Sequence, residues 1–178
     1  SYYGVVKNKI INMPGFIAVQ KNIYFKGYRK LWQEKKQCID YDEELIYVPS
    51  FRKCNFENPE FQTVLNFNRF GRLSGNDLEK ISSDPGIAVL GDSEAMGWGV
   101  NNNQTFSSIL ERKIKKRVYN LGVSSYGTYR QLIRLKKSGL VKKIDTIVIQ
   151  YHHNDLAENK IYENFLKNNE SLKTFNTF

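Results

Sequence analysis

The sequence predicts an α/β protein: a three-layer α/β/α sandwich around a parallel, doubly wound sheet, preceded by an irregular N-terminal extension. Three short segments, at residues 87–90, 118–121 and 144–151, are rich in apolar side chains and have the length of strands. The stretches between them have helical periodicity, and a strand-helix-strand-helix-strand order requires a parallel sheet with right-handed crossovers. The chain has 178 residues, of which 40% are hydrophobic, and this fits one globular domain.

The predicted elements follow one another from residue 86 onward. The first strand is a continuous apolar run, as expected of a strand buried on both faces of a parallel sheet. The first helix follows, with an apolar face that is formed by Phe106, Ile109, Leu110 and Ile114. After the second strand, a second helix is predicted around residues 129–135; it is closed by Gly139 and leads to the third strand at residues 144–151. This order of elements is typical of a flavodoxin-like sheet.

Two segments precede this α/β domain, which we place at residues 85–178. Residues 1–37 form a basic, aromatic arm that holds eight Lys or Arg and one Glu, and therefore +7 of the formal net charge of +9. Residues 38–84 form an irregular lead-in, rich in Asn, Asp, Gly and Pro. Within it, residues 61–67 alternate weakly and predict an edge strand or a hairpin.

The basic arm has three interpretations. The first is a solvated face whose aromatic side chains pack on the domain. The second is a segment that contacts an anionic membrane or polysaccharide surface, and the third is a nucleic-acid binder. Nucleic acid is the weakest of these, because the charge lies outside the patterned domain and no recognised reader motif is present.

Two cysteines, Cys38 and Cys54, are too few to build a zinc site without further Cys or His nearby, and we expect no metal and no cofactor. A disulfide between them would contribute about 3 kcal/mol, and two separate buried thiols are the alternative. A disulfide would place the protein in an extracytoplasmic compartment, periplasmic or at the cell surface. The sequence has no run of about 18 uncharged apolar residues, so a membrane anchor would have to lie in a segment not shown.

Polar residues follow each predicted strand, at the edge of the sheet where α/β proteins bind ligands. Ser93 stands at a tight turn beside Gly91 after the first strand, Gly122 follows the second, and Asn154 follows the third. Acyl transfer requires a hydroxyl nucleophile and neutral hydrogen-bond donors for the negative oxygen of the tetrahedral intermediate, each donor being worth about 3 to 4 kcal/mol. The edge of the sheet therefore predicts a serine acyl-transfer site.

These segments resemble the motif blocks of the SGNH (GDSL-type) hydrolases, in the form of extracytoplasmic bacterial members. The resemblance covers about residues 86–160 and is looser over residues 38–80. Block I corresponds to Gly91-Asp92-Ser93, the glycine block to residues 120–128, and the Gly-x-Asn-Asp block to the segment that ends in His153-Asn154-Asp155.

The resemblance implies a role for each matching residue. Ser93 would be the nucleophile, and its own backbone N–H, the N–H of Gly122 and the side chain of Asn154 would form the oxyanion hole. Asp92 would be a structural residue of the turn. His152 replaces the glycine that opens the third block, so it either crowds the pocket or changes its hydrogen bonds.

The family takes its general base from a late Asp-x-x-His motif, which these 178 residues lack. We therefore expect the C-terminal part of the domain, with at least one more strand and helix, to lie beyond Phe178, and the Ser93 hydroxyl to have no histidine partner. Two alternatives are that His152 or His153 serves as the base, and that the chain is a non-catalytic member that only binds glycan.

Two functions from different classes follow. The first is ester chemistry through Ser93, Gly122 and Asn154, in an esterase or deacylase of acylated glycans or lipids or in an O-acyltransferase. The alternative is a catalytically incomplete binding or surface-assembly module that uses its basic arm to hold an anionic glycan or membrane partner. Nucleotide binding is set aside, because residues 91–97 lack both the dinucleotide-binding glycine spacing and the P-loop lysine.

Overall fold

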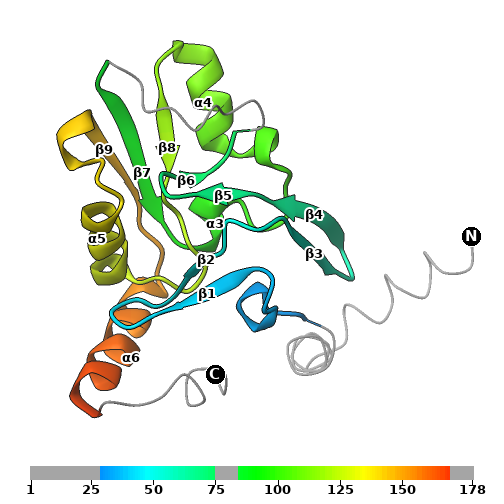
Figure 1. The fold of residues 1–178 in the computed structure, drawn as a ribbon, viewed down its shortest axis with the longest axis vertical. Coiled ribbons are helices and arrows are strands. Elements are labelled where there is room, and N and C mark those ends of the chain that lie inside the picture. Colours follow the sequence, from blue (N-terminus) through cyan, green and yellow to red (C-terminus); the bar gives the residue numbers. More distant parts are fainter. Residues whose placement is uncertain (1–28, 75–83, 169–178) are drawn as a thin grey trace, which may run out of the picture.

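The computed structural model describes residues 29–74 and 84–168 (Figure 1). Most of the predicted basic arm, part of the turn that precedes the first strand and the sequence after residue 168 lie outside these described residues.

A five-stranded mixed sheet lies at the centre, in the order β5-β6-β8-β7-β9 (Figure 1). The three predicted core strands are present and parallel to one another. The hairpin formed by β5 and β6 extends the sheet, because β6 pairs antiparallel with β8. The strands of this sheet are β5 (Phe67–Asn68), β6 (Gly71–Arg72), β7 (Gly86–Gly91), β8 (Val118–Asn120) and β9 (Ile144–Gln150).

The prediction of a parallel, doubly wound sandwich after an irregular extension is wrong. Residues 39–72 fold into three hairpins, two of which form separate two-stranded antiparallel sheets. The third hairpin makes the central sheet mixed, because its strand β6 pairs antiparallel with β8. Glycine at position 71 allows this approach, since a side chain there would collide with the main chain of Asn120. The separate hairpins consist of β1 (Ile39–Asp42), β2 (Ile46–Pro49), β3 (Cys54–Asn58) and β4 (Phe61–Leu65). β4 covers residues 61–65 of the segment for which the sequence predicts an edge strand or a hairpin, and it pairs antiparallel with β3.

Few helices cover the sheet. Leu110 of α4 packs on one face of β7 and β8, and Leu135 of α5 packs on the opposite face. The last helix, α6, follows β9 and packs beside α5. The longer helices are α4 (Phe106–Ile114), α5 (Thr128–Lys137) and α6 (Asp155–Asn168), and the shorter helical turns are η2 (Trp32–Glu34), α3 (Ser93–Met96), η3 (Asn102–Gln104) and η4 (Val141–Lys143).

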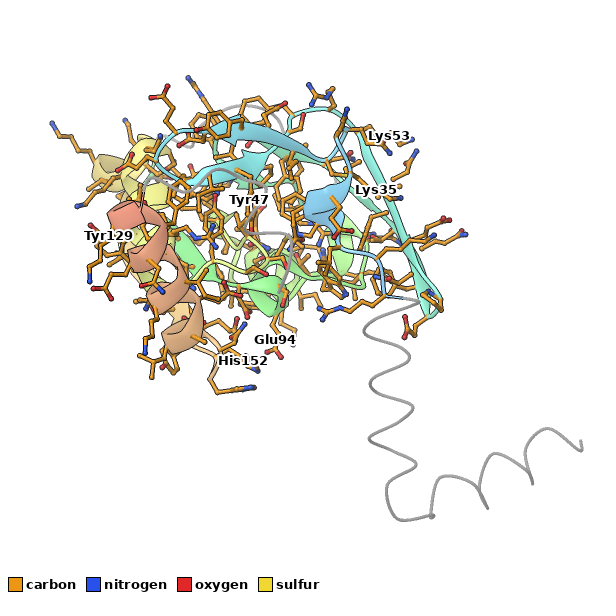
Figure 2. The ribbon with its side chains drawn as sticks, turned by 90° about the horizontal axis from the view of Figure 1, so that it is seen from below. Lys35, Tyr47, Lys53, Glu94, Tyr129 and His152 are labelled. Atoms are coloured by element: carbon orange, nitrogen blue, oxygen red, sulfur yellow. A yellow bond between two sulfur atoms is a disulfide. The ribbon has the colours of Figure 1, made fainter. Side chains whose placement is uncertain are left out.

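The largest hydrophobic cluster joins the hairpins to the helical side of the domain. Trp32 stacks on Phe67 with 6.1 Å between ring centroids, and Tyr47 of β2 lies 5.5 Å from Tyr126. Figure 2 shows Tyr47 in the interior beneath the β1-β2 hairpin. Buried aromatic pairs of this kind stabilise beyond their buried area, so the cluster holds this hairpin over the carboxyl ends of the parallel strands.

Cys38 and Cys54 form a disulfide, which confirms that prediction. The bond joins the residue before β1 to the first residue of β3, and both cysteines are fully buried. A structural disulfide is typical of proteins that fold in an oxidising, extracytoplasmic environment. In the part of the chain that the structure describes, no helix is long and apolar enough to cross a membrane.

Replacing both cysteines by alanine is expected to lower the free energy of unfolding by about 3 kcal/mol, because the closed loop spans 16 residues of sequence. Urea denaturation of the oxidised protein and of the double variant would measure the difference. The sequence has only these two cysteines, so no alternative intramolecular pairing complicates the comparison. A loss below about 1 kcal/mol would contradict a stabilising role.

Candidate functional site

Ser93 is presented at the carboxyl end of β7, where the chain turns directly into α3. Gly91 allows this turn, because a Cβ at its position would lie 2.6 Å from the Cβ of Ala95. Asp92 caps the helix, and its Oδ1 accepts a hydrogen bond of 3.1 Å from the N–H of Glu94. Ser93 is half-buried and begins the helix, so the helix provides no acceptor for its backbone N–H.

Asn154 is held beside Ser93 by a chain of hydrogen bonds. Its Nδ2 donates to Asp92 Oδ2 at 3.0 Å, and its Oδ1 lies 2.6 Å from His152 Nδ1. Because an amide oxygen accepts, this geometry makes His152 Nδ1–H the donor of that hydrogen bond. Asp92 and His152 therefore fix the orientation of the Asn154 amide, and the second hydrogen of Nδ2 remains for a ligand.

The two histidines lie on the Asn154 side of the site and not against Ser93. His152 Nε2 is 3.8 Å from Glu94 Oε1, and Figure 2 shows these two residues at the same edge of the molecule. The exposed ring of His153 lies against that of His152, with 4.0 Å between centroids and the two planes tilted by 49°. Within residues 29–74 and 84–168, the Ser93 hydroxyl makes no hydrogen bond, to a histidine or to any other group.

Gly122 is not placed as the sequence suggests. It packs beneath α3, where a Cβ would lie 2.4 Å from the backbone nitrogen of Met96. Its N–H donates to Asn120 Oδ1 at 3.0 Å. Gly122 would therefore have to give up this bond before it could stabilise an oxyanion.

A cavity of about 640 Å³ opens between the Ser93 edge of the sheet and the β1-β2 hairpin. Its walls are mixed: the sheet side carries hydroxyl, amide and carboxyl groups, and the hairpin side adds cations and an exposed tyrosine. The sheet side is formed by Ser93, Ser124, Ser125, Asn154 and Glu158, and the opposite side includes Arg29, Lys36, Asp40, Tyr41 and Arg52. Ser93 and Asn154, predicted from separate strand ends, thus line one cavity.

Glu158 is a cavity residue that the motif reasoning missed. Burial raises the pKa of its carboxyl group, although the nearby Arg130 cation opposes the rise. Glu158 lies one helical turn after Asn154, and its N–H donates to the Asn154 carbonyl oxygen at 2.9 Å. That spacing of four residues places both side chains on one helix face and was the available signal in the sequence.

Arg130 lies behind Glu158 and is another residue that the motif reasoning missed. The side chain is fully buried, and its Nη2 lies 3.8 Å from Glu158 Oε2. Its guanidinium group also donates to the carbonyl oxygens of Leu45 and Ser125. Ser125, whose φ is 61°, is in the left-handed region, and the Arg130 bond helps to hold it there. The rings of Tyr47, Tyr126 and Tyr162 surround the cation at 4.4 to 5.6 Å.

A second buried cation, Arg72, fixes the loop that follows α3. Its Nη1 donates to the carbonyl oxygens of Met96 at 2.5 Å and Gly97 at 2.6 Å, and its Nη2 donates to Val100 at 2.6 Å. Its Nε donates to Asn102 Oδ1 at 2.9 Å. Burial lowers the pKa of Arg72 to about 10. This single side chain therefore joins four points of the segment behind the candidate nucleophile.

No family model matches the chain, and no curated protein or solved structure is significantly similar to it. Among the described residues, no group of three or more His, Cys, Asp or Glu side chains is placed to hold a metal ion.

Proposed function

We propose that this chain carries the nucleophile and part of the oxyanion site of an SGNH-type serine esterase, deacylase or O-acyltransferase that acts on acyl esters. The observation that supports it is the shared cavity of Ser93 and Asn154. The Ser93 hydroxyl makes no hydrogen bond within the described residues, while Asp92 and His152 orient the Asn154 amide. A nucleophile beside an oriented donor is the arrangement that acyl transfer requires.

In the proposed reaction, Ser93 Oγ forms a bond to the ester carbonyl carbon and releases its proton to a base. The carbonyl oxygen becomes negative and accepts hydrogen bonds from Asn154 Nδ2 and the backbone N–H of Ser93. Collapse of the intermediate breaks the bond to the alcohol, which takes the proton and leaves an acyl-serine. Water then completes an esterase cycle, whereas a sugar hydroxyl as acceptor completes an acyltransferase cycle.

Two sources of the base fit this proposal. Glu158 lines the cavity, and its raised pKa favours proton acceptance closer to neutral pH than an ordinary carboxylate. The family resemblance implies a different base, the histidine of an Asp-x-x-His motif, which these 178 residues lack. The cavity is lined by polar groups and by apolar side chains such as Ile39 and Ile46, and this mixture fits an acylated glycan better than a purely apolar ester. The disulfide fits a periplasmic or cell-surface location.

A fluorophosphonate probe, read out by intact mass, tests the nucleophile. The wild-type chain is expected to gain one adduct, and Ser93→Ala is expected to gain none. Ser125→Ala is the matched control, because Ser125 lines the same cavity and should leave the adduct in place. Labelling that survives in Ser93→Ala, or that is lost only in Ser125→Ala, would assign the reactive hydroxyl elsewhere.

The second candidate is a non-catalytic module that binds an anionic glycan or membrane surface. The observation that favours it is the absence of a base against the Ser93 hydroxyl within the described residues. This function predicts no probe adduct in the wild-type chain. It also predicts salt-dependent binding to an acidic polysaccharide or to anionic vesicles that Ser93→Ala does not alter.

A further inference from the structure

The cavity extends well beyond the candidate nucleophile. Asn154 lies beside Ser93 at one end. The residues four and seven places further along the chain, Glu158 and Ile161, line the same cavity. The bond from the Glu158 N–H to the Asn154 carbonyl oxygen extends the helical geometry of α6 back to Asn154. At about 1.5 Å of rise per residue, the cavity therefore follows one face of α6 for about 10 Å. An acyl group on Ser93 would occupy only the first part of this length, so the rest can hold the alcohol part of an ester.

The part of the cavity away from Ser93, which we call the outer cavity, has both apolar and polar walls. A long acyl chain would need a continuous apolar wall, and here carboxyl and guanidinium groups interrupt the aliphatic side chains. A sugar ring fits mixed walls better, because it has hydroxyl groups at its rim and C–H groups on its faces. The outer cavity is lined by Ile39, Asp40, Tyr41 and Arg52 on the hairpin side and by Glu158 and Ile161 of α6.

Tyr41 presents an aromatic ring at the outer cavity. It belongs to β1 and pairs in register with Tyr47 of β2, but Tyr47 is buried in the core whereas Tyr41 is 63% exposed. Among the described residues, the Tyr41 ring packs against no other aromatic ring and no cation. Its position two residues after Ile39 places both side chains on the same face of the strand. An exposed ring that lines a cavity can cover an apolar face of a ligand.

Arg52 is a donor that is held in place at the same wall. Its Nη2 donates to Asp40 Oδ1 at 2.6 Å and to the carbonyl oxygens of Lys36 at 3.1 Å and Ile39 at 3.3 Å. Within the described part of the chain, its Nε and Nη1 make no hydrogen bond. The bonds to Nη2 orient the guanidinium group, so its other N–H groups can donate to a ligand at a small cost in side-chain entropy.

The charges that line the cavity are balanced. Arg52 is paired with Asp40, and Glu158 lies 3.8 Å from the buried cation of Arg130. The lining therefore has no net charge that would select an anionic ligand, and an uncharged ligand fits it best. The three cations of the lining are Arg29, Lys36 and Arg52, and its three acids are Glu34, Asp40 and Glu158.

We propose that the outer cavity binds a neutral sugar unit of a glycan. The Tyr41 ring covers one apolar face of the sugar, and Arg52 donates to a hydroxyl group at its rim. This inference deepens the proposed function and rests on it in one respect, since the bound sugar would carry the acyl ester that Ser93 attacks. Sugar binding itself requires no turnover, so it can be measured whether or not a base for Ser93 is present.

Isothermal titration calorimetry with three neutral hexasaccharides, cellohexaose, xylohexaose and mannohexaose, tests the proposal. The wild-type chain is expected to bind at least one of them. Tyr41→Ala should weaken that binding at least about 10-fold, whereas Tyr41→Phe, which keeps the ring, should bind within about 2-fold of the wild type. Tyr129→Ala is the matched control and should bind normally, because Tyr129 is also exposed, at 55%, but lies outside the cavity. Both positions are exposed, so all three variants should keep the circular dichroism spectrum of the wild type.

Labelling of the same preparations with the fluorophosphonate probe separates the sugar site from the ester chemistry. A chain that labels at Ser93 but binds none of the three sugars would overturn the sugar site and leave the ester chemistry standing. A chain that binds a sugar through Tyr41 but does not label would support the sugar site and favour a non-catalytic binding module. Sugar binding that Tyr41→Ala leaves unchanged would overturn the proposed place of the site. Binding of hexagalacturonate at least about 10-fold tighter than that of any neutral hexasaccharide would overturn the neutral class of ligand.

Discussion

Arg72→Leu is expected to lower the free energy of unfolding by about 4 kcal/mol, even though the substitution puts an apolar side chain into a buried position. The guanidinium group donates to three carbonyl oxygens and to Asn102 Oδ1, and Arg72 is only 4% exposed. Leucine removes this donor from all four acceptors. Other donors still reach Val100, Gly97 and Asn102, whereas the Met96 carbonyl oxygen loses the hydrogen bond that it accepts from Arg72. Each hydrogen bond to a charged group contributes about 1.5 to 3 kcal/mol. Chemical denaturation of the two proteins at neutral pH would measure the difference.

The matched control for this prediction is Arg112→Leu. Arg112 also donates to a backbone carbonyl, that of Asn103 in η3 at 2.9 Å, but from an exposed position where water replaces the lost bond. Its loss should cost less than about 1 kcal/mol. Equal losses in the free energy of unfolding for the two substitutions would show that the buried hydrogen bonds of Arg72 contribute no more to stability than one exposed hydrogen bond. Since Arg72 holds the residues that end α3, its loss should also slow probe labelling at Ser93, and Arg112→Leu should not.

The sequence predicts those elements of the fold whose signal is local. β7, β8 and β9 are short segments rich in apolar side chains, and α4 and α5 have helical spacing, so each could be placed from its own residues. The hairpins before residue 73 could not be placed in this way. β5 and β6 have two residues each, and the pairing of Arg72 with Asn120 joins segments 48 residues apart. Strand pairing over such distances leaves no periodicity in either segment, and for this reason the mixed sheet was not predicted.

The candidate site shows the same division. Ser93 and Asn154 were found because both follow parallel strands, and the ends of such strands converge at one edge. Arg72, Arg130 and Glu158 were not found, because charged residues are normally exposed and only the tertiary structure shows which are buried. The hydrogen bond from the Gly122 N–H to Asn120 Oδ1 could have been predicted from the sequence, since an Asn side chain often accepts from the backbone N–H two residues later.

Arg130→Leu is expected to lower the free energy of unfolding by about 4 kcal/mol at neutral pH. The substitution keeps a buried apolar volume but removes the cation that lies 3.8 Å from the largely buried carboxylate of Glu158. Breaking a buried ion pair from one side costs about 3 to 5 kcal/mol, because the remaining charge is left uncompensated. The carbonyl oxygens of Leu45 and Ser125 also lose their donor, and this part of the cost does not depend on pH.

The pH dependence of this loss identifies the Glu158 contribution. Burial raises the pKa of Glu158 in the folded protein above its value in the unfolded chain. The free energy of unfolding therefore falls as the pH rises from the unfolded-state pKa through the folded-state pKa, because the folded protein resists ionisation of this carboxyl group. Removal of Arg130 raises that pKa further, because the cation no longer favours the carboxylate. The gap in stability between the wild type and Arg130→Leu should therefore be larger at about pH 8 than at about pH 5. In a Glu158→Gln background, the same substitution should cost equally at both pH values, since no carboxyl remains to titrate. A gap that keeps its pH dependence in that background would mean that another group, and not Glu158, is the partner of the buried cation.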